Sequence, residues 1–340
     1  MQILNIKQLG KILVTGGTGF IGSALTKSLV DKGASVRVLD NNIRGDLCRL
    51  DGYHEKIEYI HGDITKYSEV YEATKGIDTV FHLAFINGTS NFYKHPEKVL
   101  EVGVKGALTS LDAAMELDVK NYIVTSSSEV YQDPTRIPTC ENERIIIPNI
   151  SNPRYSYSGG KIITELLAIH YTAKSDLNTI ICRPHNFYGP DMGVGHVIPQ
   201  FVLRMKELSN NLKKNKIEFP IQGTGDETRS FCYIDDAIDA LLLSSINGRK
   251  GEIYHLGTEN EITIKELAIN IADILGIKII IKEGELLTGG TKRRCPDISK
   301  ISKLGYSPKF SIAEGLEQTV NWYIESENKF AQNNITDLIR

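Results

Sequence analysis

The stretch Lys11-Ile-Leu-Val-Thr-Gly-Gly-Thr-Gly-Phe-Ile-Gly22 decides the fold of this 340-residue chain. Its first five residues form an apolar, β-branched run that predicts a buried strand. The apolar residues after the glycines recur with the spacing of an amphipathic helix. Gly16, Gly19 and Gly22 allow a tight turn in which backbone amides approach a pyrophosphate, and the positive end of the following helix stabilises that charge. The stretch therefore predicts a strand–turn–helix unit that binds a dinucleotide.

A carboxylate ends the second predicted strand, in Val-Arg-Val-Leu-Asp40. An acid at this place can accept hydrogen bonds from the adenosine ribose hydroxyls and would repel a 2′-phosphate, which favours NAD over NADP. Arg44 lies close by and is the residue that argues for the opposite choice. The segments after the third and fourth predicted strands should meet the adenine and the rest of the cofactor. With the glycine turn, the predicted cofactor contacts are Gly16, Gly19, Phe20, Ile21, Gly22, Asp40, Asn41, Asp63, Ile64, Leu83 and Ala84.

Strand and helix signals alternate through the first half of the chain, which is typical of a doubly wound parallel sheet with helices on both faces. The predicted strands span 11–15, 35–40, 57–61, 79–83, 122–126 and 178–183. The predicted helices span 20–32, 68–75, 96–117, 157–174, 197–210, 233–245, 264–275 and 312–325. We therefore expect an α/β Rossmann domain over residues 10–184, to which parts of the later chain return. A smaller mixed α/β lobe for substrate over 185–330 and a polar tail over 331–340 should follow.

Composition excludes several classes of protein. The net charge of −3 argues against a nucleic-acid-binding surface, which normally needs a basic excess. No stretch approaches the ~20 apolar residues of a membrane helix, and no export signal is evident, so a cytoplasmic protein without a membrane partner is expected. No metal-ligand spacing links the histidines and cysteines, so no metal site is predicted. Reduced thiols are expected at Cys48, Cys140, Cys182, Cys232 and Cys295.

The segment Tyr157-Ser-Gly-Gly-Lys161 places a phenol and an ammonium on one face of a predicted helix. Free tyrosine has a pKa of about 10, so forming the phenolate at neutral pH costs roughly 4 kcal/mol. A nearby ammonium and an oxidised nicotinamide would both lower that cost. Tyr157 can then take a hydroxyl proton while hydride leaves the same carbon. The segment Ser126-Ser-Ser-Glu-Val-Tyr131 closes the fifth predicted strand at the same ligand-binding edge of the sheet.

Together these motifs resemble the extended short-chain dehydrogenase/reductase family, the nucleotide-sugar epimerases and dehydratases, over roughly residues 10 to 325. The resemblance implies that NAD transiently oxidises the sugar of a nucleotide-diphosphate sugar, most often at C4. It implies that Ser127 shares a hydrogen bond with the reacting hydroxyl and that Lys161 also holds the nicotinamide ribose. Family members pair two helices, here 96–117 and 157–174, across a two-fold axis, so a homodimer is expected.

Glu129 bears on the second half of the reaction. In the family's dehydratases and UDP-glucuronate decarboxylases a Glu at this position serves chemistry around C5, whereas simple 4-epimerases often lack an acid there. Decarboxylases also resemble this chain in Arg154, but they depart from it at Gly189-Pro-Asp191. The dTDP-type dehydratases place an Asp where this chain has Ser128. Epimerisation, the commonest outcome in the family, is our leading expectation, followed by decarboxylation and then dehydration.

A rival from another class is a non-catalytic NAD-binding sensor on the same fold. Such a sensor would have an altered Tyr/Lys/Ser set, and here Tyr157, Lys161 and Ser127 are all present.

The later chain supplies the expected substrate contacts. Arg183-Pro-His-Asn-Phe-Tyr-Gly-Pro190 resembles the family's sugar-nucleotide segment, in which His185 stands where the family usually has an aromatic residue, so that both a stacking role and an acid–base role are open to it. The arginine fork suits two phosphate oxygens, which makes Arg229 the first candidate for the diphosphate and Arg294 the second. Asp235 and Asp236 are expected to cap the following helix. The predicted substrate contacts are Thr89, Ser128, Arg154, Asn186, Arg229 and Arg294.

Overall fold

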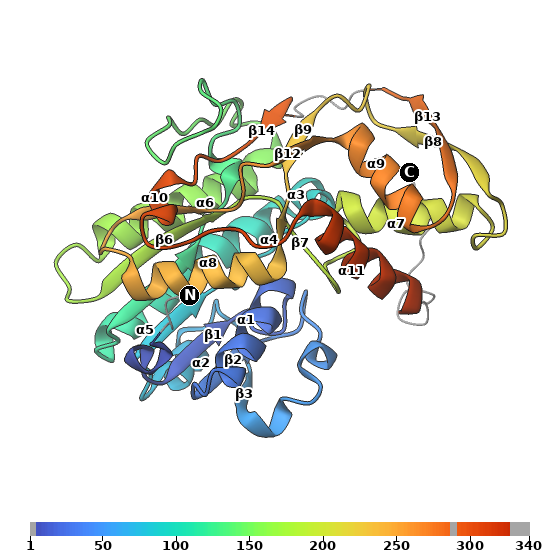
Figure 1. The fold of residues 1–340 in the computed structure, drawn as a ribbon. Coiled ribbons are helices and arrows are strands. Elements are labelled where there is room, and N and C mark those ends of the chain that lie inside the picture. The colour runs from blue at the N-terminus through green and yellow to red at the C-terminus, as the bar shows by residue number, and fades with distance from the viewer. Residues whose placement is uncertain (1–4, 286–290, 327–340) are drawn as a thin grey trace.

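The computed structural model describes residues 5–285 and 291–326, so the predicted tail 331–340 lies outside the described residues. Its centre is a seven-stranded parallel sheet in the order β11-β6-β5-β4-β1-β2-β3 (Figure 1). Six of these strands follow the sequence-based prediction closely, and the predicted fold class is confirmed. The strands are β1 (Ile12–Thr15), β2 (Val36–Asp40), β3 (Ile57–His61), β4 (Thr79–His82), β5 (Asn121–Thr125), β6 (Asn178–Pro184) and β11 (Ile253–Leu256).

Successive side chains of each strand point to opposite faces of the sheet, and helices cover both of these faces. Ile12 and Val14 belong to one apolar cluster, together with Leu25 of helix α1 (Phe20–Asp31). Leu13 lies between them in the sequence and belongs to the other cluster, with Leu111 of helix α5 (Gly106–Glu116). Full burial of such a side chain contributes about 1.5–3 kcal/mol, so the near-continuous apolar runs of the strands hold helices on both faces.

Two predicted helices contain π-helical segments. The predicted helix 96–117 is observed as α4 (Pro96–Leu100), a π-helical segment Glu101–Lys105 and α5. The predicted helix 157–174 is α6 (Ser156–Leu166), followed by a π-helical segment Leu167–Tyr171. In the first segment a side chain at Gly103 would meet the ring of Phe85 at 2.3 Å. The glycine therefore admits an aromatic ring next to the helix, close to the carboxyl end of β4.

The chain returns to the main sheet after residue 184. Strand β11, which the sequence did not predict, pairs with β6 so that His255 lies opposite Arg183. Helix α8 (Ile234–Asn247) packs against both β6 and α1. The expected caps of this helix are wrong, because its N-cap is Tyr233 and no side chain bonds its first turn. Asp236 instead accepts the backbone N–H groups of Lys309 and Phe310 at 2.9–3.0 Å, which ties a later segment to the helix.

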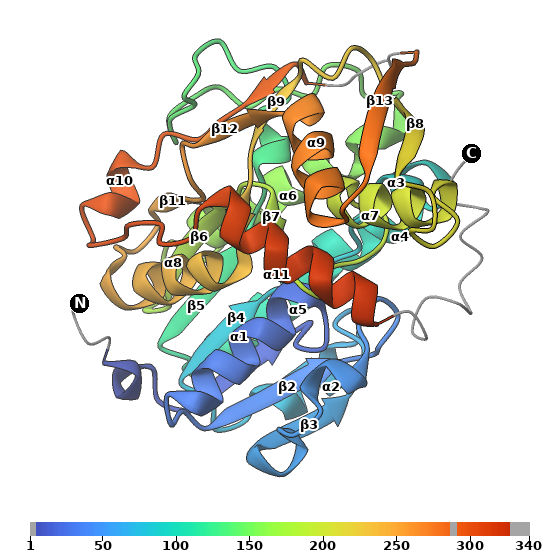
Figure 2. The same ribbon diagram turned by 45° about the vertical axis from the view of Figure 1, so that its right-hand side comes forward.

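Helix α2 (Tyr67–Thr74) packs against α5 and β2, and most of the remaining elements gather beyond the carboxyl ends of the strands (Figures 1 and 2). Helix α11 (Ile312–Glu325) packs with α7 (Val197–Leu208) and α9 (Ile264–Ile274). A capping box at Thr263 begins α9, and another at Ser311 begins α11. None of the described helices has the length and apolarity to cross a membrane. The other strands are β7 (Phe187–Tyr188), β8 (Lys216–Ile221), β9 (Thr228–Ser230), β10 (Cys232–Tyr233), β12 (Glu261–Thr263), β13 (Lys278–Glu283) and β14 (Arg293–Arg294). The other helices are α2 (Tyr67–Thr74), α3 (Thr89–Lys94), α7 (Val197–Leu208), α9 (Ile264–Ile274), α10 (Ser299–Ser302) and α11 (Ile312–Glu325).

Candidate active site

In the turn between β1 and α1, Gly16 and Gly22 leave space that a side chain at either position would fill. A side chain on Gly16, whose φ is +72°, would lie 2.8 Å from the backbone of Ala84. One on Gly22 would lie 2.1 Å from the carbonyl oxygen of Gly16. Helix α1 begins after Gly19 with no side-chain hydrogen bond to its first turn. The first amides of the helix are therefore available to an anion, which is what a dinucleotide pyrophosphate requires.

A cavity opens beside this turn. It is also lined by Arg44 and Phe85, and its walls include these predicted cofactor residues: Gly16, Gly19, Asp40, Asn41, Ile64, Leu83 and Ala84. Phe20 lines a different cavity, next to Trp322. The carboxylate of Asp63 accepts the backbone N–H of Thr65 at 2.9 Å and is engaged in its own turn. The cavity brings most, though not all, of the predicted set to one surface.

Asp40 ends β2 at the wall of this cavity and is nearly buried. One carboxylate oxygen accepts the backbone N–H of Thr18 at 3.0 Å, and the other accepts that of Asn42 at 2.9 Å. The two amides orient the carboxylate toward the end of the strand and leave further lone pairs for ribose hydroxyls. The glycine cradle, the uncapped helix and this oriented carboxylate fit NAD.

Tyr157 and Lys161 lie on α6 and are both buried. The Lys161 Nζ donates to the carbonyl oxygen of Thr125 at 2.6 Å, and it lies 5.8 Å from the centroid of the Tyr157 ring. Burial lowers the pKa of Lys161 to about 7, which Glu165 partly opposes. Burial raises the pKa of Tyr157 to about 12, whereas a hydrogen bond from Ser127 acts to lower it. Tyr157 therefore needs an additional positive charge near its hydroxyl to become a base at neutral pH.

Two aromatic rings that the sequence analysis missed enclose the phenol. The ring of Phe92 stacks on that of Tyr157 with centroids 4.8 Å apart, and Phe85 meets it edge-on at 5.1 Å. The Lys161 Nζ lies 4.0 Å from the centroid of the Phe85 ring. The position of Phe85 directly after Leu83 and Ala84 was the available signal. These rings exclude water from the phenol, which explains the direction of its pKa shift.

Glu129 lies at the centre of a group of arginines. Its carboxylate accepts Arg294 Nη1 at 2.6 Å, which makes an ion pair between β14 and the turn after β5. Burial alone would raise the pKa of Glu129, but Arg294 and then Arg154 hold it below its ordinary value. The Nε atom of Arg154 is buried without a hydrogen-bond partner. The site thus contains more positive charge than Glu129 neutralises.

Arg229 completes this group. Its guanidinium donates to the carbonyl oxygens of Thr228 and Thr291, both at 2.7 Å. Burial, followed by the neighbouring Arg294, lowers the pKa of Arg229 to about 10. We call Glu129, Arg154, Arg229 and Arg294 the arginine cluster. Three cations around one carboxylate suit a substrate that brings further negative charge.

The other predicted substrate residues are distributed around this region. Ser128 is buried beside Glu129, and the Asn186 amide donates to the carbonyl oxygen of Ser230 at 3.1 Å. Thr89 is exposed at the start of α3, which packs against the turn that carries Arg154. His185 is buried, and its ring meets that of His255 edge-on with centroids 4.7 Å apart. Within residues 5–285 and 291–326, no hydrogen bond or ion pair links Thr89 to the arginine cluster.

The glycine turn, the buried Tyr–Lys pair and the serine at the end of β5, all on one edge of a parallel sheet, define a short-chain dehydrogenase/reductase. The chain belongs to the NAD dependent epimerase/dehydratase family, whose model matches residues 12–257. This membership confirms the prediction of an enzyme that uses NAD, within a family that modifies nucleotide sugars. The described residues contain no group of three or more His, Cys, Asp or Glu that could hold a metal ion, and the five cysteines are free thiols.

Two relatives carry the name of a decarboxylase. The chain is 31% identical to the UDP-N-acetyl-alpha-D-glucosaminuronate decarboxylase of Bacillus cytotoxicus, over 94% of this chain and 99% of that protein. It is 33% identical to UDP-glucuronic acid decarboxylase 6 of Arabidopsis thaliana, over 90% of this chain and 86% of that one.

Other proteins with similar folds, whose structures have been solved, are named for other reactions. An epimerase of Methanothermobacter thermautotrophicus is 28% identical with a TM-score of 0.86, covering 96% of each chain. The dTDP-glucose 4,6-dehydratase of Streptomyces venezuelae, solved with NAD bound, is 29% identical with a TM-score of 0.83, covering 94% of this chain and 98% of that one. The fold is therefore shared across the three reactions, and the residues of the site must distinguish them.

Proposed function

We propose that this protein is an NAD-dependent decarboxylase of a nucleotide-linked hexuronate, with UDP-glucuronate and its 2-acetamido form as the substrate class. The observation that carries the proposal is the Glu129–Arg294 ion pair inside the arginine cluster, beside Ser127 and Tyr157. A 4-epimerase acting on a neutral hexose needs cations for the diphosphate, but it needs neither cations for a sugar carboxylate nor an acid near C5. The similarity to decarboxylases, at 31–33% identity, supports the same choice. Decarboxylation therefore replaces epimerisation as the leading reaction.

In the first half of the reaction the Tyr157 oxygen takes the proton of the sugar C4 hydroxyl. Ser127 shares a hydrogen bond with that hydroxyl and keeps it aligned with Tyr157. Lys161 lies within a helical turn of Tyr157 and stabilises the phenolate. Bound NAD supplies the acceptor for the hydride that leaves C4 and returns it at the end. The rings of Phe85 and Phe92 exclude water from the reacting hydroxyl.

In the second half the 4-keto-uronate is a β-keto acid. Its C5–C6 bond breaks, CO₂ leaves, and the electron pair of that bond forms an enolate across C4 and C5. Arg154 and Arg294 hold the departing carboxylate in the geometry that allows this cleavage. A proton must then be added to C5, and the Glu129 carboxylate relays it from water. The C4 ketone is finally reduced, with Tyr157 returning its proton to the oxygen.

The remaining assignments combine this cavity and the arginine cluster with the contacts predicted from the sequence. We propose that Asp40 binds the adenosine ribose and selects NAD, and that Lys161 also contacts the nicotinamide ribose. Arg229 and Asn186 are proposed to bind the substrate diphosphate. We propose that the other cofactor contacts are Gly16, Gly19, Phe20, Ile21, Gly22, Asn41, Asp63, Ile64, Leu83 and Ala84, and that Thr89 and Ser128 contact the sugar.

The test is to incubate the purified protein and NAD with UDP-glucuronate, with its 2-acetamido form, and with UDP-glucose. Product mass and the NMR spectrum of the sugar are then recorded. We expect the two uronates to lose the mass of CO₂ and give a pentose, while UDP-glucose, the matched substrate without a carboxylate, is unchanged. A uronate product of unchanged mass with an inverted carbon, or a product that has lost water from UDP-glucose, would overturn the proposal.

Epimerisation at C4 is the second candidate. It is favoured by the TM-score of 0.86 to an epimerase over 96% of the chain. The same incubation separates the two reactions, because an epimer keeps the mass of its substrate.

A further inference from the structure

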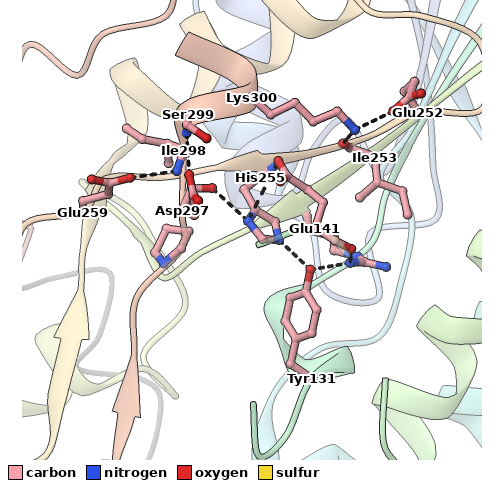
Figure 3. A network of polar contacts seen from close by, with 12 residues as sticks. Tyr131, Glu141, Glu252, Ile253, His255, Glu259, Asp297, Ile298, Ser299 and Lys300 are labelled. Carbon is pink, nitrogen blue, oxygen red and sulfur yellow. Dashed lines mark hydrogen bonds and ion pairs between the residues drawn. The ribbon is translucent and has the colours of Figure 1, made fainter. Parts of the chain in front are cut away.

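A chain of polar contacts links the helix α6 to the segment that carries Arg294, and Figure 3 shows its part around Tyr131, His255 and Asp297. It begins next to the Tyr157–Lys161 pair, passes through the hydroxyl of Tyr131 and ends at the backbone carbonyl of Asp297. None of its members belongs to the reacting groups described above. We call Ser126, Tyr131, Glu141, Glu165, Arg183, His255 and Asp297 the Tyr131 network.

The first link fixes α6 to the sheet. Glu165 follows Lys161 by one helical turn and is almost completely buried, as is Arg183 on β6. The two carboxylate oxygens of Glu165 accept Arg183 Nε at 2.8 Å and Nη2 at 2.6 Å. The hydroxyl of Ser126, which precedes the catalytic Ser127, donates to the same carboxylate. Because both charges are paired in a bidentate contact, the helix and the ends of β5 and β6 are held in one register.

In the central link, the chemistry of the partners fixes which atom donates and which atom accepts each hydrogen bond. The Nδ1 atom of His255 faces the Asp297 carbonyl oxygen at 3.1 Å, and since a carbonyl only accepts, Nδ1 carries the proton. Burial lowers the pKa of His255 to about 3, so the ring is neutral and Nε2 is an acceptor. Nε2 accepts the Tyr131 hydroxyl at 2.6 Å, and the Tyr131 oxygen in turn accepts Arg183 Nη1. The Tyr131 hydroxyl thus bridges Arg183 and the His255 ring. Glu141 forms a second connection, because its carbonyl oxygen accepts Arg183 Nη1 at 3.0 Å and its carboxylate accepts the His255 backbone N–H at 3.1 Å.

The last link reaches the arginine cluster. The backbone N–H of Asp297 donates to the Thr139 carbonyl oxygen at 2.8 Å, and that of Thr139 to Cys295 at 2.9 Å. Arg294 directly precedes Cys295 and pairs with Glu129, which is two residues before Tyr131. The segment 129–139 is therefore joined to the segment 294–297 at three places: by the Glu129–Arg294 ion pair, through Tyr131 and His255, and by the backbone hydrogen bonds of Thr139.

From this geometry we propose that Tyr131 is a positioning residue, whose hydroxyl sets the Glu129–Arg294 pair at its working distance from Ser127 and Tyr157. The chemical role of that pair rests on the proposed function, whereas its geometry does not. Loss of the hydroxyl leaves Nε2 of His255 buried without a donor, which the structure relieves by shifting the ring and the Asp297 segment. Arg294 then moves away from Glu129, while the half of the site on α6 keeps its Glu165–Arg183 contact.

The test is the variant Tyr131→Phe, which removes one oxygen and keeps the buried ring. In a single turnover with enzyme in excess, quenched samples are analysed for keto-sugar and finished product. We expect NAD affinity and formation of the keto-sugar to stay close to wild type, while conversion of the keto-sugar slows about tenfold, as a lost hydrogen bond near a charged group implies. A crystal structure of the variant should show Arg294 Nη1 farther from Glu129 Oε1 than the wild-type 2.6 Å.

Tyr323→Phe is the matched control, because this buried tyrosine also loses a hydrogen bond, to the Met192 carbonyl oxygen, outside the Tyr131 network. If both variants slow oxidation and conversion equally and in step with their loss of thermal stability, Tyr131 has no positioning role. An unchanged conversion rate with an unmoved Arg294 would also overturn it. Should Tyr131→Phe fail to fold, His255→Asn breaks the same bridge from the other side.

The proposed function can be excluded independently of the role of Tyr131. If wild type forms an epimer and releases no CO₂, decarboxylation is excluded, while the ratio of keto-sugar to finished product and the Arg294–Glu129 distance still decide the role of Tyr131.

Discussion

Arg294 Nη1 lies 2.6 Å from a carboxylate oxygen of Glu129, a residue 165 positions earlier in the chain. One partner comes from the turn after β5, next to the catalytic serine, and the other from a short strand near the end of the chain. Sequence analysis assigned Arg294 to the diphosphate and Glu129 to chemistry at C5, as separate roles. Their pairing holds the Glu129 carboxylate beside a cation, which lowers its pKa, and is the reason decarboxylation displaces epimerisation as the proposed reaction.

Replacing Tyr157 with Phe should lower turnover by about 10²–10⁴-fold, the range for loss of a general base. NAD affinity, measured by the quenching of protein fluorescence, should change little, because the phenol touches the sugar and not the cofactor phosphates. Tyr93→Phe, at an exposed tyrosine, is the control. Wild-type turnover in the Tyr157 variant would remove the basis of the mechanism.

Glu129→Gln should separate the two halves of the reaction. The amide keeps the shape of the side chain but cannot relay a proton, so the keto-sugar should form and then persist, with product formation reduced at least about 100-fold. Mass analysis of quenched reactions measures both species. Glu207→Gln, at an exposed glutamate on α7, should behave as wild type. Equal loss of both species in the Glu129 variant would instead place this residue in substrate binding.

The stability of the protein should rise with pH because of Lys161. Its pKa is about 7 in the folded protein, against an ordinary value of 10.5. Between these values the unfolded chain holds a proton that the folded protein lacks, so the free energy of unfolding increases with pH across this window. From pH 7 to pH 9 the gain is about 2 kcal/mol.

Urea unfolding without added NAD measures this slope. Lys161→Met should lose the slope relative to wild type, and Lys214→Met, at an exposed lysine, is the control. A Lys161 variant with the wild-type slope would show that this ammonium is not the titrating group.

Gly22→Ala should weaken NAD binding by at least about tenfold, since the added carbon would lie 2.1 Å from the Gly16 carbonyl oxygen and force the turn open. Isothermal titration calorimetry gives the affinity. Gly195→Ala has no neighbour within 4 Å at its added carbon and should bind NAD normally. Normal binding by the Gly22 variant would mean that the pyrophosphate does not use this turn.

We predict a homodimer formed through α4 and α6, of which α6 carries Tyr157 and Lys161. Leu100 of α4 and Ile163 and Leu166 of α6 are 39%, 38% and 51% exposed, which is unusual for large apolar side chains. Sedimentation equilibrium at micromolar concentration should report a dimer for wild type and a monomer for Leu166→Glu. Ile280→Glu, on β13 and 41% exposed, should remain dimeric. A wild-type monomer contradicts the prediction.

Six strands could be predicted because their apolar runs are local signals, and the strands at the centre of the sheet are buried on both faces. The seventh, β11, is four residues long and lies between glycines, in a section that shows no strand–helix rhythm. It becomes a strand only because its backbone can pair with the edge of β6, about 70 residues earlier. Asp236 was assigned to a helix cap for the same reason, since its true partners at Lys309 and Phe310 are distant in the sequence.

By itself the sequence determined the parallel sheet, the dinucleotide turn and the identity of the Tyr157–Lys161–Ser127 set, because spacings of a few residues specify turns and helix faces. Tertiary structure alone decided what surrounds that set: the Phe85 and Phe92 rings, the pairing of Glu129 with Arg294, and the Tyr131 network. These contacts join residues on different elements, most of them far apart in the sequence, and their geometry depends on how the strand ends converge, which no local pattern of residues encodes.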